Sequence, residues 1–246
     1  MKVSIKPAAG FSGAIHILLQ VLLPALVFVF ARLRFFELAT ALILLAKWRM
    51  FAVKPRHWLA NIRANAVDII VGMSLLIFMI HSGSQIMQLL WAVLYCLWLI
   101  FLKPRSNQLG VVAQAYAAEA LGLLALFVHW GDAPIYGLVI GAWVVCYAAA
   151  RHFFSAFDEP LNRFLAGVWG YTAAALVWLL SHWLLFYGLV SQPTLILLIV
   201  SFGVSSMYYL EKTDRLSIML RRQILFVVIA LVGIIMLFSN WGDKTI

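Results

Sequence analysis

The stretch Leu109–Val128, LGVVAQAYAAEALGLLALFV, has a single charged residue, Glu119, near its middle. Twenty residues of α-helix are about 30 Å long, which matches the hydrocarbon core of a bilayer. An acid at that depth costs about 2.5–3.5 kcal/mol on insertion scales, so it needs a partner, a proton or a function. The stretch therefore predicts a membrane-spanning helix and makes Glu119 the first candidate for a functional site.

Similar hydrophobic runs recur along the whole chain. Of the 246 residues, 65% are hydrophobic and 11% are charged, whereas soluble domains carry about 25% charged residues. We predict an all-α, polytopic integral membrane helical bundle, a single transmembrane domain over residues 1–246 with about nine (eight or nine) transmembrane helices. The runs cover roughly 11–31, 35–52, 66–82, 86–102, 109–129, 134–150, 164–187, 193–210 and 223–241.

The run 35–52 leaves the count open. Glu37 and Lys47 enclose nine uncharged residues, about 15 Å of helix against a hydrocarbon core of about 30 Å. The run spans the membrane if its charged ends reach the interface, and otherwise it lies along the surface. Both arrangements place equal numbers of basic residues inside, so the side of the N-terminus also stays open.

A spacing of about 50 residues favours helical hairpins as the repeating unit. Lys54-Pro-Arg56 and Lys103-Pro-Arg105 lie 49 residues apart, and His81, His129 and His182 end successive runs at intervals of 48 and 53 residues. Such a period is consistent with internal symmetry, although paired spans of bilayer length produce it as well.

The connecting segments predict the orientation. Lys and Arg gather in 54–63, 103–108, 151–163 and 211–222, whereas 81–85 and 129–133 contain neither residue. By the positive-inside rule, we expect a multi-pass protein of the cytoplasmic (inner) membrane with its basic loops inside and its C-terminus outside. This explains the net charge of +9 without nucleic acid as a partner. Anionic lipid headgroups gain about 1 kcal/mol per basic residue at such loops.

A buried polar site is expected around Glu119. Tyr116 and Gly122 lie one turn away on the same helix face, and Gln114 is close in sequence. We expect Glu119, Tyr116 and Gln114 to bind a substrate or a proton in a cavity. The alternative is a protonated Glu119 that bonds a tyrosine or glutamine of a neighbouring helix and serves packing alone.

Small residues at four-residue spacing predict close helix contacts in the same region. Gly137 and Gly141 form a G-x-x-x-G, and Ala166 and Gly170 repeat the spacing. We expect the fifth, sixth and seventh runs to pack together within the chain. A homodimer through Gly137/Gly141, or another protein partner, is the alternative.

Two further groups of polar residues are candidate sites. In the segment 151–163, a lipid headgroup or coupling site is one reading, and a helix cap by Asp158 and Glu159 beside Pro160 is the other; its residues are Arg151, His152, Asp158, Glu159 and Arg163. On the outer side, His81, His129, His182 and Asp132 would bind zinc or copper if their helices converged, but without metal-motif spacing we expect no metal site.

The sequence ranks three functions. The first is a small carrier-type or lipid-handling protein with its polar site around Glu119. The second is a non-catalytic membrane subunit or assembly partner, and the third is an intramembrane enzyme acting on a lipid or isoprenoid. Enzymes usually show several convergent polar groups, and the spans contain no paired acids, so an enzyme ranks last. No catalytic residue is assigned, and the sequence does not decide whether a cofactor is present.

Overall fold

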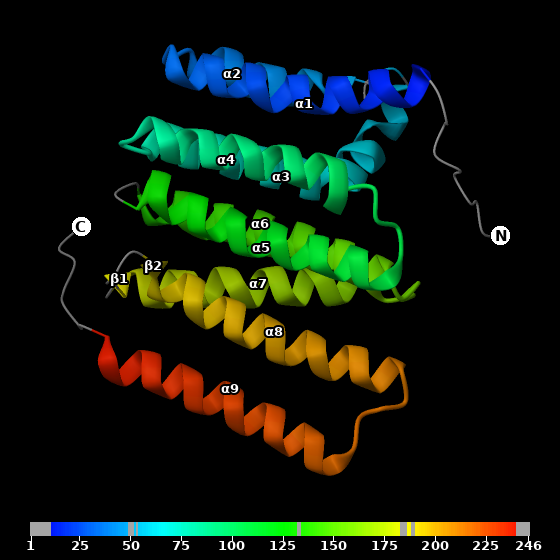
Figure 1. Cartoon of the computed structure of the whole chain (residues 1–246). Coiled ribbons are helices and arrows are strands. Elements are labelled where there is room, and N and C mark those ends of the chain that lie inside the picture. Colours follow the sequence, from blue (N-terminus) through cyan, green and yellow to red (C-terminus); the bar gives the residue numbers. More distant parts are fainter. Residues whose placement is uncertain are drawn as a thin grey trace. The chain divides into compact units, whose positions relative to one another are not determined.

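The structure is a computed structural model that describes residues 11–48, 52, 54–131, 134–182, 186–187 and 190–239. It is built from helices, with one short hairpin of two strands, and the helices form two compact units, Met1–Ser106 and Asn107–Ile246 (Figure 1). Within the described residues, seven helices are long and apolar enough to cross a membrane. The predicted helical architecture is therefore confirmed, and the length and composition of these helices are consistent with a membrane-spanning bundle, while the count of nine and the 50-residue repeat stay predictions.

Within its described residues, unit 1 has four α-helices and two further helical segments whose bounds are defined. In chain order these are α1 (Phe11–Arg32), α2 (Phe36–Leu45), the 3₁₀-helix η2 (Pro55–His57), α3 (Trp58–His81), α4 (Gln85–Leu97) and the π-helix η3 (Trp98–Leu102). Ser84 caps α4 by accepting a hydrogen bond from the backbone amide of Met87.

The length of α2 bears on whether the run 35–52 spans the membrane. It has ten residues and is therefore about 15 Å long, half the thickness of the hydrocarbon core. Lys47 follows two positions after its last residue, so the charge that closes the run lies just beyond the helix end. As a straight helix, α2 is too short to span the membrane alone.

Three helices of unit 1 meet at Gly72 of α3. A Cβ atom at this position would lie 2.8 Å from the Tyr95 hydroxyl oxygen and 3.1 Å from Cγ2 of Ile43. Both Tyr95 and Ile43 are almost fully buried. Any larger residue at 72 would displace these side chains, so Gly72 is what allows α2 and α4 to approach α3 so closely.

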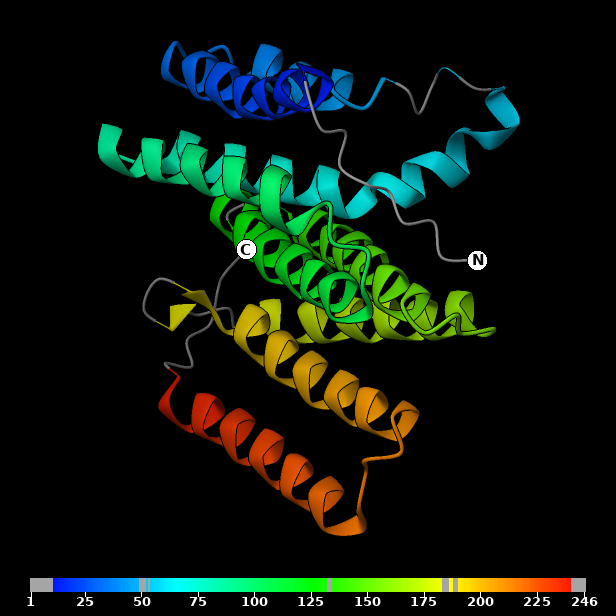
Figure 2. The ribbon, with the colours of Figure 1, turned by 45° about the vertical axis from the view of Figure 1, so that its right-hand side comes forward.

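Unit 2 begins with α5 (Gln108–Trp130), α6 (Ile135–Ser155) and α7 (Asn162–Ser181). The strands β1 (Phe186–Tyr187) and β2 (Val190–Ser191) form an antiparallel hairpin, followed by α8 (Gln192–Lys212) and α9 (Ile218–Phe238). Figure 2 shows α8 and α9 as an antiparallel pair. Side chains of Asn107, Ser191 and Ser217 cap α5, α8 and α9 respectively.

Glycines mark the close contacts between neighbouring helices of unit 2. A Cβ atom on Gly141 of α6 would lie 2.4 Å from Leu126 Cδ1 of α5, and one on Gly170 of α7 would lie 3.1 Å from Tyr147 Cβ of α6. The expected packing of these three helices within the chain is thus present. A homodimer through Gly137/Gly141 stays a prediction.

Candidate functional site

Glu119 lies midway along α5 and is buried. Equal lengths of α5 precede and follow it, and its exposed fraction is 4%. The carboxyl group faces the other helices of unit 2, since its three hydrogen-bond partners come from α6, α7 and α8. Glu119 therefore joins four helices at one point inside the unit.

The two carboxyl oxygens of Glu119 have different surroundings. Oε1 accepts a hydrogen bond of 3.1 Å from the Trp169 indole nitrogen and a weak one of 3.7 Å from the Cys146 thiol. Oε2 accepts a hydrogen bond of 2.7 Å from the Ser201 hydroxyl. An indole N–H is a donor only, whereas a hydroxyl both donates and accepts.

This asymmetry allows Glu119 to exist in both protonation states. As a carboxylate, it receives hydrogen bonds from all three partners. As a neutral acid, it would carry its proton on Oε2 and donate to Ser201 Oγ, while Oε1 still accepts from Trp169. The position thus satisfies the requirement that a buried acid have partners, and it can release or take up a proton without losing the Trp169 bond.

A cavity of about 260 Å³ opens beside the carboxyl group. Its walls come from α5, α6, α7 and α8, and Glu119 is the one charged residue among those described residues that line it. Besides the Glu119 carboxyl group, the polar atoms of the wall come from a few hydroxyls and the Trp169 indole, and the rest of the wall is apolar. The lining residues are Ala115, Tyr116, Glu119, Ala149, Ala150, Phe153, Phe154, Leu165, Val168, Trp169, Ser201, Val204, Ser205 and Tyr208.

Tyr208 joins the cavity to a polar contact near the end of α8. Its hydroxyl donates a short hydrogen bond to Glu159 of the α6–α7 turn, and the Lys212 ammonium lies 2.9 Å from the same carboxylate. The hydrogen bonds from Tyr208 and Lys212 hold the pKa of Glu159 below its usual value. These contacts attach the α6–α7 turn to α8.

Aromatic rings surround Tyr208. Phe153, Phe154 and Phe157 each pack edge-on or tilted against neighbouring rings of this cluster, with Phe154 and Phe157 both 5.2 Å from the Tyr208 ring. Lys212 Nζ lies 5.5 Å from the Tyr208 ring centre. The cavity is therefore bounded toward the α6–α7 turn by aromatic side chains, with a cation beyond them.

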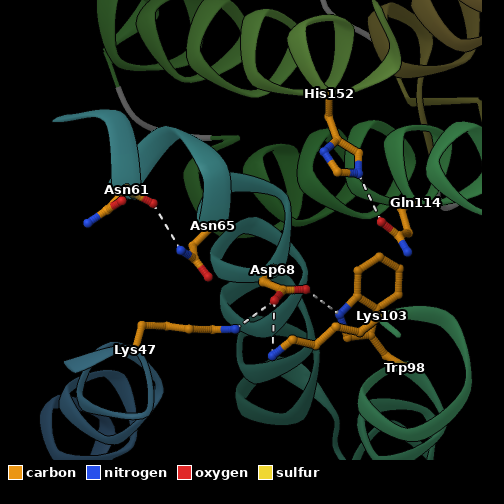
Figure 3. A network of polar contacts seen from close by, with 8 residues as sticks. All are labelled: Lys47, Asn61, Asn65, Asp68, Trp98, Lys103, Gln114 and His152. Atoms are coloured by element: carbon orange, nitrogen blue, oxygen red, sulfur yellow. Dashed lines mark hydrogen bonds and ion pairs between the residues drawn. The ribbon is translucent and has the colours of Figure 1, made fainter. Parts of the chain in front are cut away.

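Of the three residues expected to form the site, Glu119 and Tyr116 line the cavity and Gln114 does not. Tyr116 lines the same cavity, as its position one turn away predicted. Gln114 is buried but belongs to another contact, since its Oε1 lies 2.9 Å from His152 Nε2 of α6 (Figure 3). Gln114 therefore links α5 to α6 instead of lining the cavity.

The five residues of segment 151–163 have different partners. His152 contacts Gln114, the Arg151 guanidinium donates to the Tyr147 hydroxyl, and Glu159 bonds Tyr208 and Lys212. Asp158 and Arg163 are exposed.

Neither Asp158 nor Glu159 is the N-cap residue of α7, although the Glu159 carboxylate accepts a hydrogen bond from the Leu161 backbone amide. The N-cap residue is Leu161, which has no side-chain capping bond within the described residues. The reason is geometric: Asp158 adopts a left-handed backbone with φ 50°, and the Glu159 carboxylate reaches across to α8.

The outer histidines do not form a metal site in the described part of the chain, where no three His, Cys, Asp or Glu side chains lie close enough to share an ion. His182 Nδ1 lies 2.8 Å from the Trp178 carbonyl oxygen, and the His129 ring packs near Trp130. His81 ends α3 in unit 1. Asp132 lies outside the described residues.

Sequence reasoning missed the partners of Glu119. Cys146, Trp169 and Ser201 are 27, 50 and 82 positions away, and no local pattern connects them to α5. One signal was available for Ser201, because Ser201 and Ser205 place two hydroxyls one turn apart, and Ser201 follows the apolar run 195–200.

Comparisons with known protein families, with characterised proteins and with solved structures give no match to this chain.

Proposed function

We propose that the chain is a small carrier-type or lipid-handling membrane protein that holds an apolar or amphiphilic ligand in the cavity beside Glu119. The observation that carries this proposal is the opening of an apolar cavity onto a buried carboxyl group. The cavity volume of about 260 Å³ is close to the lower limit of about 300 Å³ for small-molecule sites. A mostly apolar wall with a few polar groups at fixed positions is typical of such sites.

The wall chemistry suggests how a ligand would lie. Its apolar body would contact the side chains of Ala115, Ala149 and Val204, which line the cavity. A hydrogen-bonding group of the ligand would meet Ser205 or Tyr208, while Glu119 already receives bonds from the protein. Because the hydrogen-bonding positions of the Glu119 carboxyl group are already occupied by protein groups, we do not expect the ligand to bond Glu119 directly. The protonation state of Glu119 would instead change how polar the cavity is.

Proton coupling is the specific part of this proposal. A neutral Glu119 would donate a hydrogen bond to Ser201 Oγ, whereas a charged Glu119 would keep its three protein partners but lose any contact with water once an apolar ligand fills the cavity. We expect an apolar ligand to bind more tightly to the protein in which Glu119 is neutral, so that affinity falls as the pH rises through the titration of Glu119.

The test is Glu119→Gln, which imitates the neutral acid. The amide oxygen can accept from Trp169 in place of Oε1, and the amide nitrogen can donate to Ser201 in place of the protonated Oε2. Binding of a dansyl-labelled fatty alcohol, which has no acidic group of its own, to the protein in nanodiscs is measured between pH 5 and pH 9. We expect the wild type to lose affinity with rising pH and Glu119→Gln to keep it.

The matched control is Glu211→Gln, the same chemical change near the exposed end of α8. It should retain the pH dependence of the wild type. Equal pH profiles for wild type and Glu119→Gln would refute the coupling, and absence of saturable binding in both would refute the ligand site.

A role as a membrane subunit is the second candidate, and α9 is the observation that favours it. Among the described residues, α9 packs mainly on α8, and Ile235 is its one buried residue. A partner protein would cover this helix if the chain belonged to a complex. Mild detergent extraction followed by size-exclusion chromatography tests this, since a stoichiometric second protein supports it and an isolated chain contradicts it.

The orientation is also a proposal. We infer that the α6–α7 and α8–α9 turns face the cytoplasm because residues 151–163 and 211–222 carry most basic residues of unit 2. Labelling of single cysteines placed at 158 and 214 by an impermeant reagent in whole cells and in inverted vesicles tests it. Labelling in inverted vesicles alone is expected.

A further inference from the structure

The net charge of the chain resides entirely in the residues of unit 1. Residues 1–106 contain 11 of the 18 basic residues and two of the nine acidic ones, whereas residues 107–246 contain seven of each. The two acids of unit 1 are Glu37 and Asp68. A membrane protein with this division has one half that attracts anions and one that is neutral overall.

Asp68 is at the centre of a cluster with two lysines (Figure 3). The Lys47 ammonium donates a hydrogen bond of 2.6 Å to Asp68 Oδ2, and the Lys103 ammonium lies 3.1 Å from the same oxygen. The Trp98 indole nitrogen donates to Oδ1 at 3.2 Å. Both oxygens of Asp68 thus have partners, and the cluster carries one more positive charge than negative.

The π-helix η3 explains how α4 supplies two of these partners. Trp98 and Lys103 are five residues apart, and in an α-helix such residues point about 140° away from each other. The backbone amide of Lys103 instead bonds the Trp98 carbonyl oxygen at 2.9 Å, which is the i→i+5 bond of a π-helix. This wider turn brings both side chains to one side of the helix, toward Asp68.

The cluster lies at the level where two helices end. Lys103 follows the last residue of η3, and Lys47 follows α2 by two positions. Asp68 lies in the first half of α3, whereas Lys103 follows the end of the span Gln85–Leu102. Because membrane helices end near the headgroups, Lys103 is the member of the cluster that reaches that region. Its exposure is graded: the side chains of Lys47 and Asp68 are 9% and 14% exposed, whereas that of Lys103 is 37% exposed.

We propose that the Lys47–Asp68–Lys103 cluster binds the phosphate of an anionic lipid headgroup. A phosphodiester carries a single negative charge, which matches the excess charge of the cluster. Lys103 is the exposed ammonium that would approach the phosphate, while Asp68 and Trp98 hold the end of α4 in place. Lysine ammonium groups bind phosphate well as point charges. This site lies within unit 1 and does not depend on the cavity beside Glu119.

The cluster accounts for features that an ordinary ion pair leaves unexplained. An isolated Lys47–Asp68 pair would already be neutral, yet the π-turn adds a second cation to the same carboxylate oxygen. Asp68 offsets one of the two positive charges, so the cluster as a whole still attracts an anion. A phosphate at Lys103 would offset the remaining charge.

Native mass spectrometry of the full chain released from nanodiscs tests the proposal. The nanodiscs contain equal amounts of phosphatidylglycerol and phosphatidylcholine, and the retained lipids are counted. Lys103→Gln should lower the retained phosphatidylglycerol relative to phosphatidylcholine by well over fivefold, because about fivefold is already the effect of one basic residue at a membrane surface without a built site. Asp68→Asn should raise it, because it removes the internal anion.

Arg222→Gln is the matched control, since it removes one positive charge from α9 of unit 2. It should change lipid retention much less than Lys103→Gln does. Equal losses in the two variants would overturn the site in favour of diffuse surface charge. If Asp68→Asn does not fold, the difference in retained phosphatidylglycerol between Lys103→Gln and Arg222→Gln still tests the proposed site.

A second measurement separates the lipid from free phosphate. Inorganic phosphate at millimolar concentration is added to protein in phosphatidylcholine nanodiscs, and thermal stability is recorded. A lipid site predicts stabilisation by phosphatidylglycerol and none by inorganic phosphate. Stabilisation by inorganic phosphate that disappears in Lys103→Gln would overturn the lipid assignment and identify a soluble anion as the ligand.

Discussion

The Ser201 hydroxyl donates a hydrogen bond of 2.7 Å to Glu119 Oε2 and so joins α8 to the centre of α5. Ser201 is itself 9% exposed, so water does not readily replace it. Loss of a partner from a buried polar group costs about 1–3 kcal/mol, more when that group is charged.

We therefore expect Ser201→Ala to lower the free energy of unfolding by about 1–3 kcal/mol. Reversible unfolding in SDS–detergent mixtures measures it. Ser74→Ala is the control, because Ser74 is buried in α3 and bonds only the Ile70 carbonyl of its own helix among the partners described. Ser74→Ala should lower the free energy of unfolding clearly less than Ser201→Ala does. Equal losses would mean that the Ser201–Glu119 hydrogen bond does not stabilise the protein.

Close packing at Gly141 gives the second prediction. A Cβ atom there would lie 2.4 Å from Leu126 Cδ1, so Gly141→Val should push α5 and α6 apart and cost about 1–3 kcal/mol. Gly167→Val is the control, since no described atom lies within 4 Å of its added Cβ. Thermal unfolding of both variants in detergent tests this, and similar losses would contradict it.

The sequence predicted the helix around Glu119 well. The run 109–129 corresponds to α5, Gln108–Trp130, because Asn107 caps one end and polar or aromatic residues mark the other. Tyr116 was also correctly placed, since helical periodicity fixes which residues share a face. Local rules were sufficient for both.

The rest of the site depends on tertiary packing. Trp169 and Ser201 meet Glu119 because of the way α7 and α8 cross α5, which no spacing within one helix encodes. Gln114 shows the same dependence on packing: its position in sequence is close to Glu119, but it contacts His152 on α6 and is not among the residues that line the cavity. The π-turn at Trp98–Leu102 likewise has no signature in the hydrophobic pattern.

Acid should weaken the contact between the α6–α7 turn and α8. Tyr208 and Lys212 lower the pKa of Glu159 in the folded protein below its ordinary value of 4.5. The folded state thus binds the Glu159 proton less tightly than the unfolded state does. The stabilisation is complete above about pH 4.5 and disappears as the pH falls through the lower folded value.

The measurement compares wild type with Glu159→Gln in SDS unfolding at several pH values. Wild type should be more stable at pH 7, and the difference should shrink below pH 4.5. Glu211→Gln should produce no comparable pH-dependent difference. A difference that stays constant down to pH 3 would show that Glu159 acts through shape alone.

Alkaline pH should act in the opposite sense at Lys47. Burial lowers the pKa of Lys47 to about 8, although Asp68 opposes the shift. A folded value below the ordinary 10.5 means that the unfolded state binds this proton more tightly. The free energy of unfolding therefore increases as the pH rises from about 8 to about 10.5.

We expect the stability of wild type relative to Lys47→Met to increase over this interval, as measured by thermal unfolding at pH 7.5, 8.5 and 9.5. Lys54→Met, which changes an exposed lysine of the same unit, should run parallel to wild type. A wild-type curve parallel to that of Lys47→Met would mean that Lys47 stays charged throughout and that Asp68 outweighs burial.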